Sequence, residues 1–442
     1  MGKTWRQEIL RLAVPAFLAL VIEPLFLLTD SAIVGHLGTA QLAGLGVASA
    51  VLLTAVNIFV FLAYATTSVV ARQIGAGSTR RALEAGVDGL WLAIGLGVLT
   101  AVIVDTLAGQ LSSALGATGP TLTEAVRYLR IAAYGIPGML VVLATTGVLR
   151  GLQDTRTPLL AAVLGFGVNI VLNLWFVLGL GMGIAGSALG TAIAQTGMGL
   201  ALGIVLAVKA RSAGASLRSN PAGVLSAARG GAPLLVRTLA LRAWLVLTTW
   251  LAAGFGVTVL ASHQVVSTVW SFLSFALDAL AIAGQAITGR LLGAADTTGA
   301  REATTVMVRW GVGAGVVLGL ATAALHTVLP AIFTTDPAVR SAVAAGLLVV
   351  AIQQPLTAYI FVADGILIGA GDGRWLAGAM ALALVAYLPA LGAIYALAHT
   401  WDPGPDAAIV LIWLGMSWFL LVRGALMGWR LRRDTWMVTG AD

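Results

Sequence analysis

Residues 9–34 read ILRLAVPAFLALVIEPLFLLTDSAIV, an apolar run that contains only three charged residues, Arg11, Glu23 and Asp30. A run of this length forms a helix long enough to cross about 30 Å of hydrocarbon. Comparable runs recur along all 442 residues, and apolar residues make up 59% of the chain while charged residues make up 10%. Soluble proteins average about 25% charged residues, so the composition excludes a soluble protein and predicts a polytopic membrane protein.

The fold class follows from the length and continuity of the runs. They do not alternate with a period of two residues, which excludes an outer-membrane β-barrel and predicts an all-α protein with twelve transmembrane helices. The predicted spans are residues 9–34, 42–71, 85–108, 127–150, 158–180, 184–208, 232–255, 260–290, 303–328, 340–369, 375–399 and 407–430. The chain has no cysteine, which excludes disulfides and thiolate metal sites.

The distribution of positive charge predicts the orientation in the membrane. Arginine and lysine residues concentrate at one set of connections and at both termini, whereas the opposite set holds only Arg127, Arg130 and Arg340. The positive-inside rule then places both termini in the cytoplasm. We therefore predict a multi-pass protein of the plasma (inner) membrane, whose net charge of +7 reflects a basic surface facing the cytoplasm and not a nucleic-acid partner.

The two halves of the chain resemble each other when one is shifted by 218 residues. Pro15 then falls on Pro233, RQIGA from Arg72 on RLLGA from Arg290, and GVLRGLQDTR from Gly147 on GILIGAGDGR from Gly365. Six spans per copy give both copies the same orientation, which predicts two parallel six-helix repeats. We expect an N-terminal lobe (1–208), a cytoplasmic loop (209–231), and a C-terminal lobe with a short cytoplasmic tail (232–442). Two such bundles suit transport by alternating access.

Several motifs resemble the multidrug and toxic compound extrusion (MATE) family. They are TDSAIVGHLGTAQLAGLGVAS from Thr29 and GVLRGLQDTRTP from Gly147, with DALAIAGQAITGRLLGA from Asp278 and ADGILIGAGDGRW from Ala363 resembling its DinF-like branch. The resemblance covers nearly the whole chain. It implies a secondary antiporter that exports small amphiphilic or cationic organic compounds in exchange for H⁺ or Na⁺, without another cofactor. A transporter with two lobes needs no second subunit, so we expect a monomer in the lipid bilayer.

Asp30 is the leading candidate for the coupling residue. An ionised carboxylate in hydrocarbon is expensive, so an acidic residue in a membrane helix usually faces the interior of the bundle or a wet cavity. Its equivalent in the repeat is Thr248, so the acid is not part of the shared scaffold. The alternative is an Asp near a helix end that hydrogen-bonds a loop.

Asn169 and Asn173 are the second group of candidates, because two residues four apart share a helix face. Their amides could hydrogen-bond Asp30 or supply oxygens to Na⁺, or they could simply hold helices together. The resemblance to DinF-like proteins implies an Asp at position 173, acting with Asn169 and Thr191. This chain departs from that pattern, and fewer carboxylates favour H⁺ over Na⁺.

Glu23 lies two helical turns before Asp30 and is followed by Pro24. Glu23 could act as a second proton site or hold a cationic substrate. It could equally form a static ion pair with Arg242 of the seventh span. The sequence does not separate these alternatives.

The second half offers further candidates for a cavity. Asp278 and Asp364 lie within spans and could face a cavity or be satisfied structural acids. Four aromatic residues within spans could stack on a cationic substrate, although such residues also pack or face lipid. They are Tyr64, Trp175, Trp270 and Tyr359.

Two other functions are weaker alternatives. A flippase for lipid-linked precursors would share the two lobes, but it would commonly carry more cationic residues in its cavity. Here only Arg237 and Arg242 appear deep in a span. An intramembrane enzyme would need convergent acid–base or metal ligands, and the His and acidic residues are too scattered to form a set. We therefore expect no enzymatic activity and no metal site.

Overall fold

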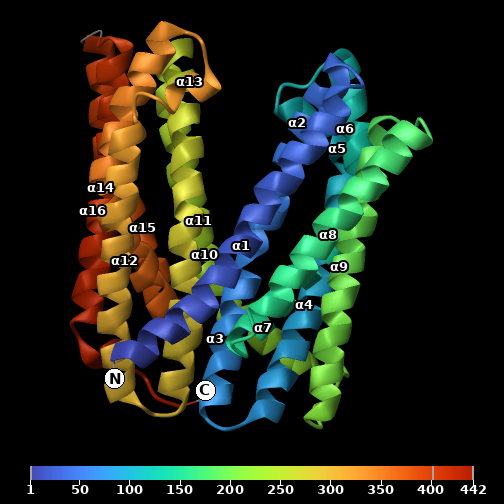
Figure 1. The fold of residues 1–442 in the computed structure, drawn as a ribbon, viewed down its shortest axis with the longest axis vertical. Helices are drawn as coiled ribbons and strands as arrows, with labels where there is room; N and C mark the ends of the chain where they lie inside the picture. The colour runs from blue at the N-terminus through green and yellow to red at the C-terminus, as the bar shows by residue number, and fades with distance from the viewer. Residues whose placement is uncertain (1, 401–402, 441–442) are drawn as a thin grey trace. The chain divides into compact units, whose positions relative to one another are not determined.

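The computed structural model describes residues 2–400 and 403–440 (Figure 1). Within these residues, twelve helical spans are long and apolar enough to cross a membrane, and no strand occurs. Each predicted span overlaps one of them, which confirms the all-α, twelve-helix fold.

The first six spans lie between residues 2 and 212. They are α1 (Gly2–Gly35); α2 (Thr39–Asn57) and α3 (Phe61–Gly75), joined by the 3₁₀ turn η1 (Ile58–Val60); α4 (Thr79–Thr106); α6 (Gly119–Ala132) and α7 (Ile136–Gly151), joined by the 3₁₀ turn η2 (Ala133–Gly135); α8 (Arg156–Asn173), extended by the π-helical turn η3 (Leu174–Gly179); and α9 (Ile184–Ser212). The short helix α5 (Ala108–Ala114) connects α4 to α6.

The last six spans are mostly single long helices. They are α10 (Pro221–Gly254), α11 (Val257–Gly293), α12 (Thr297–Leu325), α14 (Pro337–Gly369), α15 (Gly373–Thr400) and α16 (Pro405–Leu431). The short helix α13 (Pro330–Phe333) precedes α14, and the 3₁₀ turn η4 (Asp434–Trp436) follows α16. Side-chain caps start three of these helices, since Asn220 accepts from the backbone N–H of Ala222, Asp296 from that of Gly299 and Asp336 from that of Ala338.

The connection predicted over residues 209–231 is shorter in the structure. α9 continues to Ser212 and α10 begins at Pro221, which leaves 213–220 between them. Alanine and arginine are strong helix formers, so both helices extend beyond their apolar segments. Proline at the first position of α10 favours a helix start there.

The described chain divides into two compact units. The N-terminal unit contains Leu12–Ala232, and the C-terminal unit contains Pro233–Leu292 and Asp296–Thr439 together with residues 2–11. Within the C-terminal unit α14 packs against both α12 and α16, and these three helices lie side by side in Figure 1. Within the N-terminal unit α7 packs against α3, α4 and α9, and α9 also packs against α8 and α6.

Close glycine contacts recur in the two units at positions 218 residues apart. In each unit, two glycines four apart let one helix touch the backbone of another, and a Cβ on any of them would collide with that backbone. The contacts are Gly147 with Ala63 and Gly151 with Thr67 in the N-terminal unit, and Gly365 with Ala281 and Gly369 with Gln285 in the C-terminal unit. Both halves therefore repeat the same helix-packing arrangement, which agrees with the predicted repeat.

Candidate functional site

Asp30 is buried near the end of α1, with 3% of its surface exposed. Its carboxylate accepts two side-chain hydrogen bonds. Asn173 Nδ2 on α8 donates to Oδ1 over 3.1 Å, and Thr191 Oγ1 on α9 donates to Oδ2 over 3.2 Å. Three helices of the N-terminal unit therefore meet at this carboxylate.

Asn169 extends the network by one step. Its Nδ2 donates to Thr191 Oγ1 over 3.1 Å, so the Thr191 hydroxyl accepts from Asn169 while it donates to Asp30. Asn173 Nδ2 also donates to the backbone carbonyl of Asn169 over 3.2 Å. The structure thus brings together Asp30, Asn169, Asn173 and Thr191, four of the five residues predicted for ion coupling; the fifth, Glu23, is exposed on α1.

Glycines on α9 explain how its backbone comes close enough. Gly186 and Gly190 are four residues apart and share a face of the helix. A Cβ at Gly190 would lie 3.2 Å from the backbone nitrogen of Asn173, and one at Gly186 would lie 2.9 Å from the carbonyl carbon of Phe176. The segment GSALG therefore sets the distance from α9 to the end of α8 and places Thr191 beside Asp30.

The polar surroundings of Asp30 contain additional oxygens. Asn169 Oδ1 and Asn173 Oδ1 are fully buried and have no hydrogen-bond partner within residues 2–400 and 403–440. Amide oxygens accept hydrogen bonds and are ligands for hard cations. A carboxylate surrounded by neutral donors and free acceptors can take up a proton or a small cation without losing all of its partners.

Two further residues of this site were not predicted from the sequence. Tyr128 on α6, 2% exposed, and fully buried Ser187 lie beside Thr191, and Tyr128 is also close to Asp30. Ser187 lies one turn before Thr191 on the same face of α9, a spacing that could have identified it. Tyr128 carries no such signal, because it reaches the site only through the packing of α6 against α9.

In the C-terminal unit, the positions equivalent to Asp30 and Asn169 carry hydroxyl groups instead. Thr248 corresponds to Asp30 and Tyr387 to Asn169, and their side-chain oxygens are 2.9 Å apart. Because the Thr248 hydroxyl donates to the backbone carbonyl of Trp244 over 2.8 Å, Tyr387 is the donor to Thr248. In the N-terminal unit Asp30 and Asn169 are linked through the Thr191 hydroxyl, whereas Thr248 and Tyr387 contact each other directly and neither is an acid.

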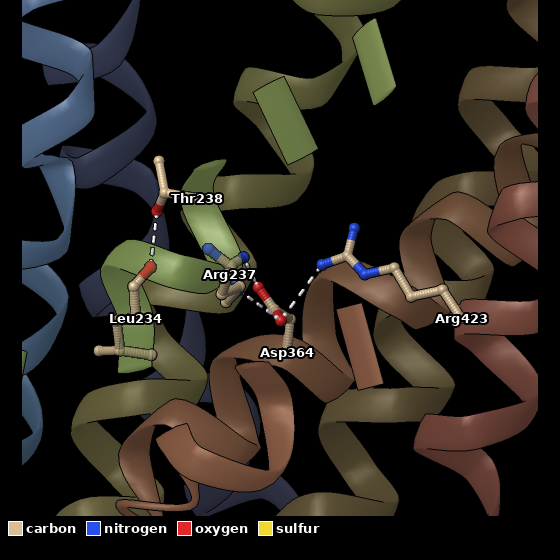
Figure 2. A network of polar contacts seen from close by, with 5 residues as sticks. All are labelled: Leu234, Arg237, Thr238, Asp364 and Arg423. Carbon is tan, nitrogen blue, oxygen red and sulfur yellow. Dashed lines mark hydrogen bonds and ion pairs between the residues drawn. The ribbon is translucent and has the colours of Figure 1, made fainter. Parts of the chain in front are cut away.

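Asp364 on α14 lies in a different environment (Figure 2). Arg237 of α10 donates to both carboxylate oxygens, with Nε 3.0 Å from Oδ1, and Arg423 Nη2 of α16 lies 3.2 Å from Oδ1. Figure 2 shows the two arginines approaching Asp364 from opposite sides. All three residues are at most 6% exposed, so this buried ion cluster ties together three helices of the C-terminal unit.

This cluster adds Arg423 to Arg237 and Arg242, the two arginines predicted to lie deep in a span of the second half. Arg423 is 4% exposed, whereas Arg242 on α10 is exposed. Arg423 lies close to the end of its predicted span, where an arginine commonly extends to the membrane surface. The carboxylate of Asp364 and the packing of α16 against α14 hold it inside instead.

The other acidic candidates differ in burial. Glu23 is exposed on α1, unlike Asp30, although both lie on the same helix. Asp278 is half-buried on α11. The pairing of Glu23 with Arg242 stays a prediction.

The four aromatic candidates occupy different surroundings within their units. Trp270 lies in a buried cluster, with its ring 6.0 Å from that of Trp244 and 6.5 Å from that of Trp413. Trp175 is 56% exposed in the π-helical turn and stacks on Phe176. Tyr64 is half-buried on α3, and half-buried Tyr359 lines a groove between α14 and α16.

Comparisons with known proteins match this architecture. Protein DETOXIFICATION 44, chloroplastic, of Arabidopsis thaliana is 33% identical over 97% of this chain and 82% of its own length. DNA damage-inducible protein F of Escherichia coli is 27% identical over 96% of this chain and 92% of its own. The crystal structure of the Vibrio cholerae MATE transporter VcmN in the bent form has the same fold, with a TM-score of 0.87 at 23% identity over 98% of this chain and 99% of that one.

The MatE family profile matches residues 15–175 and 233–390. The two matches begin at Pro15 and Pro233, which are equivalent positions in the repeat. Together they cover most of both units, so the chain belongs to the MatE family.

Proposed function

We propose that this protein is a secondary active antiporter that exports amphiphilic or cationic organic compounds in exchange for H⁺. The observation that carries the proposal is the buried carboxylate of Asp30, held by neutral donors from α8 and α9 in one repeat and absent from the other. Membership of the MatE family supports transport, and Asp30 supplies a group that can bind and release the coupling ion.

The hydrogen bonds suggest how proton binding is coupled to movement. The ionised Asp30 accepts charge-assisted bonds from Asn173 and Thr191, which are about twice as strong as bonds between neutral groups. Protonation replaces them by weaker neutral bonds and loosens the attachment of α1 to α8 and α9. Because α1 contains Pro24 less than two turns before Asp30, it is suited to bend at that point. We propose that this change drives alternating access, with both termini in the cytoplasm.

Na⁺ is a second candidate for the coupling ion. The observation in its favour is the pair of buried amide oxygens, Asn169 Oδ1 and Asn173 Oδ1, which have no partner within the described residues. Such oxygens could join the carboxylate of Asp30 in coordinating a hard cation. H⁺ is preferred because Asp30 is the only acid in this network of four side chains.

Proteoliposomes containing the purified protein test both ions. An inward pH gradient and, separately, an inward Na⁺ gradient are imposed, and movement of a fluorescent cationic dye is followed for the native chain and Asp30→Asn. We expect the pH gradient to drive transport and Asp30→Asn to abolish it. The matched control is Asp406→Asn, which changes an exposed carboxylate at the start of α16.

Other results would redirect the assignment. Transport driven only by the Na⁺ gradient would favour Na⁺ as the coupling ion. Full gradient-driven transport by Asp30→Asn would overturn the role of Asp30 and direct attention to Glu23 and Asp278. Failure of both gradients to move dye in the native protein would favour the flippase alternative, which is tested by movement of a labelled lipid between leaflets.

A further inference from the structure

A groove of about 600 Å³ lies between α14 and α16 of the C-terminal unit. Its lining includes Tyr359 of α14, Ala425, Gly428 and Trp429 of α16, and Arg432 and Arg433, which follow α16. Its volume falls within the range of about 300–1,000 Å³ that is typical of ligand sites. No part of this groove belongs to the Asp30 network.

Two glycines in the segment GALMG form the base of the groove. A Cβ at Gly424 would lie 2.9 Å from Leu356 Cδ1, and one at Gly428 would lie 3.1 Å from Tyr359 Oη. This GxxxG spacing lets α16 approach α14 closely. The adjacent Ala425 is exposed and small, so the groove beside this contact stays open.

The groove carries two positive charges that have no ion-pair partner among the residues the structure describes. Arg432 and Arg433 are exposed, and within residues 2–400 and 403–440 neither has a carboxylate within 4 Å. Their neighbours differ, since Arg430 pairs with Asp372 at 2.6 Å and Asp434 with Arg301 at 2.9 Å. The guanidinium carbon of Arg433 lies 4.2 Å from the centre of the Trp429 ring, which holds its charge over the aromatic side of the groove.

A groove at the corresponding end of the N-terminal unit provides a contrast. It is lined by Arg80 and Lys209, among others, but both cations are paired within the protein. Arg80 contacts Glu84 at 2.9 Å, and Lys209 contacts Asp154 at 3.7 Å. Among the described residues, the absence of carboxylate partners for Arg432 and Arg433 therefore distinguishes the groove between α14 and α16.

An exposed apolar stripe on α16 leads into the groove. Leu414, Trp418, Leu421 and Trp429 are each about half exposed and lie on one face of the helix. In a membrane helix such a face contacts acyl chains. The groove thus lies between an apolar surface suited to acyl chains and two arginines with an aromatic ring at the end of the helix. This arrangement fits a lipid better than a free phosphate ion.

We propose that this groove binds an anionic phospholipid. Its phosphate would lie between Arg432 and Arg433, which can hydrogen-bond phosphate oxygens in a forked geometry. Its glycerol backbone would lie against Trp429 and Tyr359, and its acyl chains would follow the exposed face of α16 past Ala425. This site is independent of the proposed transport function.

Native mass spectrometry of the delipidated full chain tests the proposal. The protein is titrated with phosphatidylglycerol, with phosphatidylcholine of the same acyl chains, and with glycerol phosphate. We expect preferential binding of phosphatidylglycerol and little binding of glycerol phosphate. The variant Arg432→Gln/Arg433→Gln should bind phosphatidylglycerol roughly tenfold or more weakly, since each arginine near a membrane surface contributes about fivefold in affinity for anionic lipid.

Two further variants make the test specific to the groove. Ala425→Trp should fill the groove and weaken phosphatidylglycerol binding with both arginines present. Arg80→Gln/Arg81→Gln, which removes two exposed arginines from the N-terminal unit, should leave binding unchanged. Equal affinity for the two lipids, unchanged binding by the Arg432/Arg433 variant, or an equal loss in the Arg80/Arg81 control would overturn the proposal. Glycerol phosphate binding as tightly as the lipid would identify a phosphate-ion site instead.

Discussion

Asp30 and Asp364 are both buried carboxylates, but their partners suit them to different tasks. Asp30 contacts an amide and a hydroxyl, which are neutral and place no fixed charge beside it. Asp364 contacts two guanidinium groups, which are always charged. A change of charge at Asp364 would remove the carboxylate that contacts two buried cations, whereas the neutral partners of Asp30 tolerate a change of charge. The identity of the contacting groups therefore favours Asp30 for coupling and Asp364 for structure.

Substitution of Thr191 tests the hydroxyl that links Asn169 to Asp30. Thr191→Val removes both of its hydrogen bonds with little change in size, whereas Thr191→Ser retains the hydroxyl. A hydrogen bond to a charged group contributes about 1.5–3 kcal/mol, so we expect Thr191→Val to lower the initial rate of gradient-driven dye transport roughly tenfold or more. Thr191→Ser should stay close to the native rate. An equal loss in both variants would assign Thr191 a packing role instead.

Asp364→Asn tests the structural role of the buried ion cluster. The change leaves Arg237 and Arg423 buried without their carboxylate, and breaking a buried pair in this way costs about 3–5 kcal/mol. We expect a clear fall in the thermal unfolding temperature in detergent. Glu84→Gln is the control, because it breaks an exposed pair worth about 0.3–0.5 kcal/mol. A native unfolding temperature for Asp364→Asn would show that the cluster does not stabilise the C-terminal unit.

At the scale of the helices, small residues decide which side chains can meet. Gly186 and Gly190 bring α9 against the end of α8, and this contact sets the position of Thr191 relative to Asn173. The π-helical turn begins directly after Asn173. Such turns are rare and often occur at functional sites, so the local irregularity of α8 coincides with the candidate site.

Gly190→Ala tests this helix contact. The added Cβ would lie 3.2 Å from the backbone nitrogen of Asn173 and must displace α9 by a few tenths of an ångström. We expect slower gradient-driven transport because the bonds between Thr191, Asn169 and Asp30 lengthen. Gly203→Ala on the same helix is the matched control, since a Cβ there meets nothing within 4 Å. Equal transport rates for the two variants would show that the function of the site does not depend on the close contact at Gly190.

At the scale of the whole molecule, the duplicated scaffold places a buried acid at the position of Asp30 in only one copy. The backbone contacts of Gly147 and Gly151 recur at Gly365 and Gly369, so the architecture is shared. The positions equivalent to Asp30 and Asn169 are also buried and polar in the second copy, where Thr248 and Tyr387 contact each other and neither is an acid. The repeat thus supplies two similar bundles, while the difference at one position restricts the proposed ion site to the N-terminal unit.

The Thr248–Tyr387 contact should therefore affect stability and not coupling. Thr248→Val leaves the buried Tyr387 hydroxyl without its acceptor, which costs about 1–3 kcal/mol and should lower the unfolding temperature. The double variant Thr248→Val/Tyr387→Phe removes both groups and should recover much of that loss. Proton-coupled dye transport should persist in both variants. Loss of coupling as complete as in Asp30→Asn would show that the C-terminal unit also takes part.

The sequence alone was sufficient to predict the twelve spans and the repeat. A span is recognised because hydrocarbon requires a continuous apolar run of sufficient length, and that requirement acts on neighbouring residues in the chain. Asp30 could be singled out for the same reason, since a charge within such a run is expensive. The shared helix face of Asn169 and Asn173 was also readable, because helical periodicity is a local property.

Only the tertiary structure decided which polar groups meet. Tyr128 joins the Asp30 site, and Arg423 joins Asp364, through contacts between helices that are distant in the sequence. In a membrane helix a buried polar group must find a partner, but its type does not specify which helix provides one. That choice depends on how closely and in which orientation the helices pack. Composition and periodicity therefore determined the helices and one unusual acid, whereas helix packing determined the partners on which the chemistry of that acid depends.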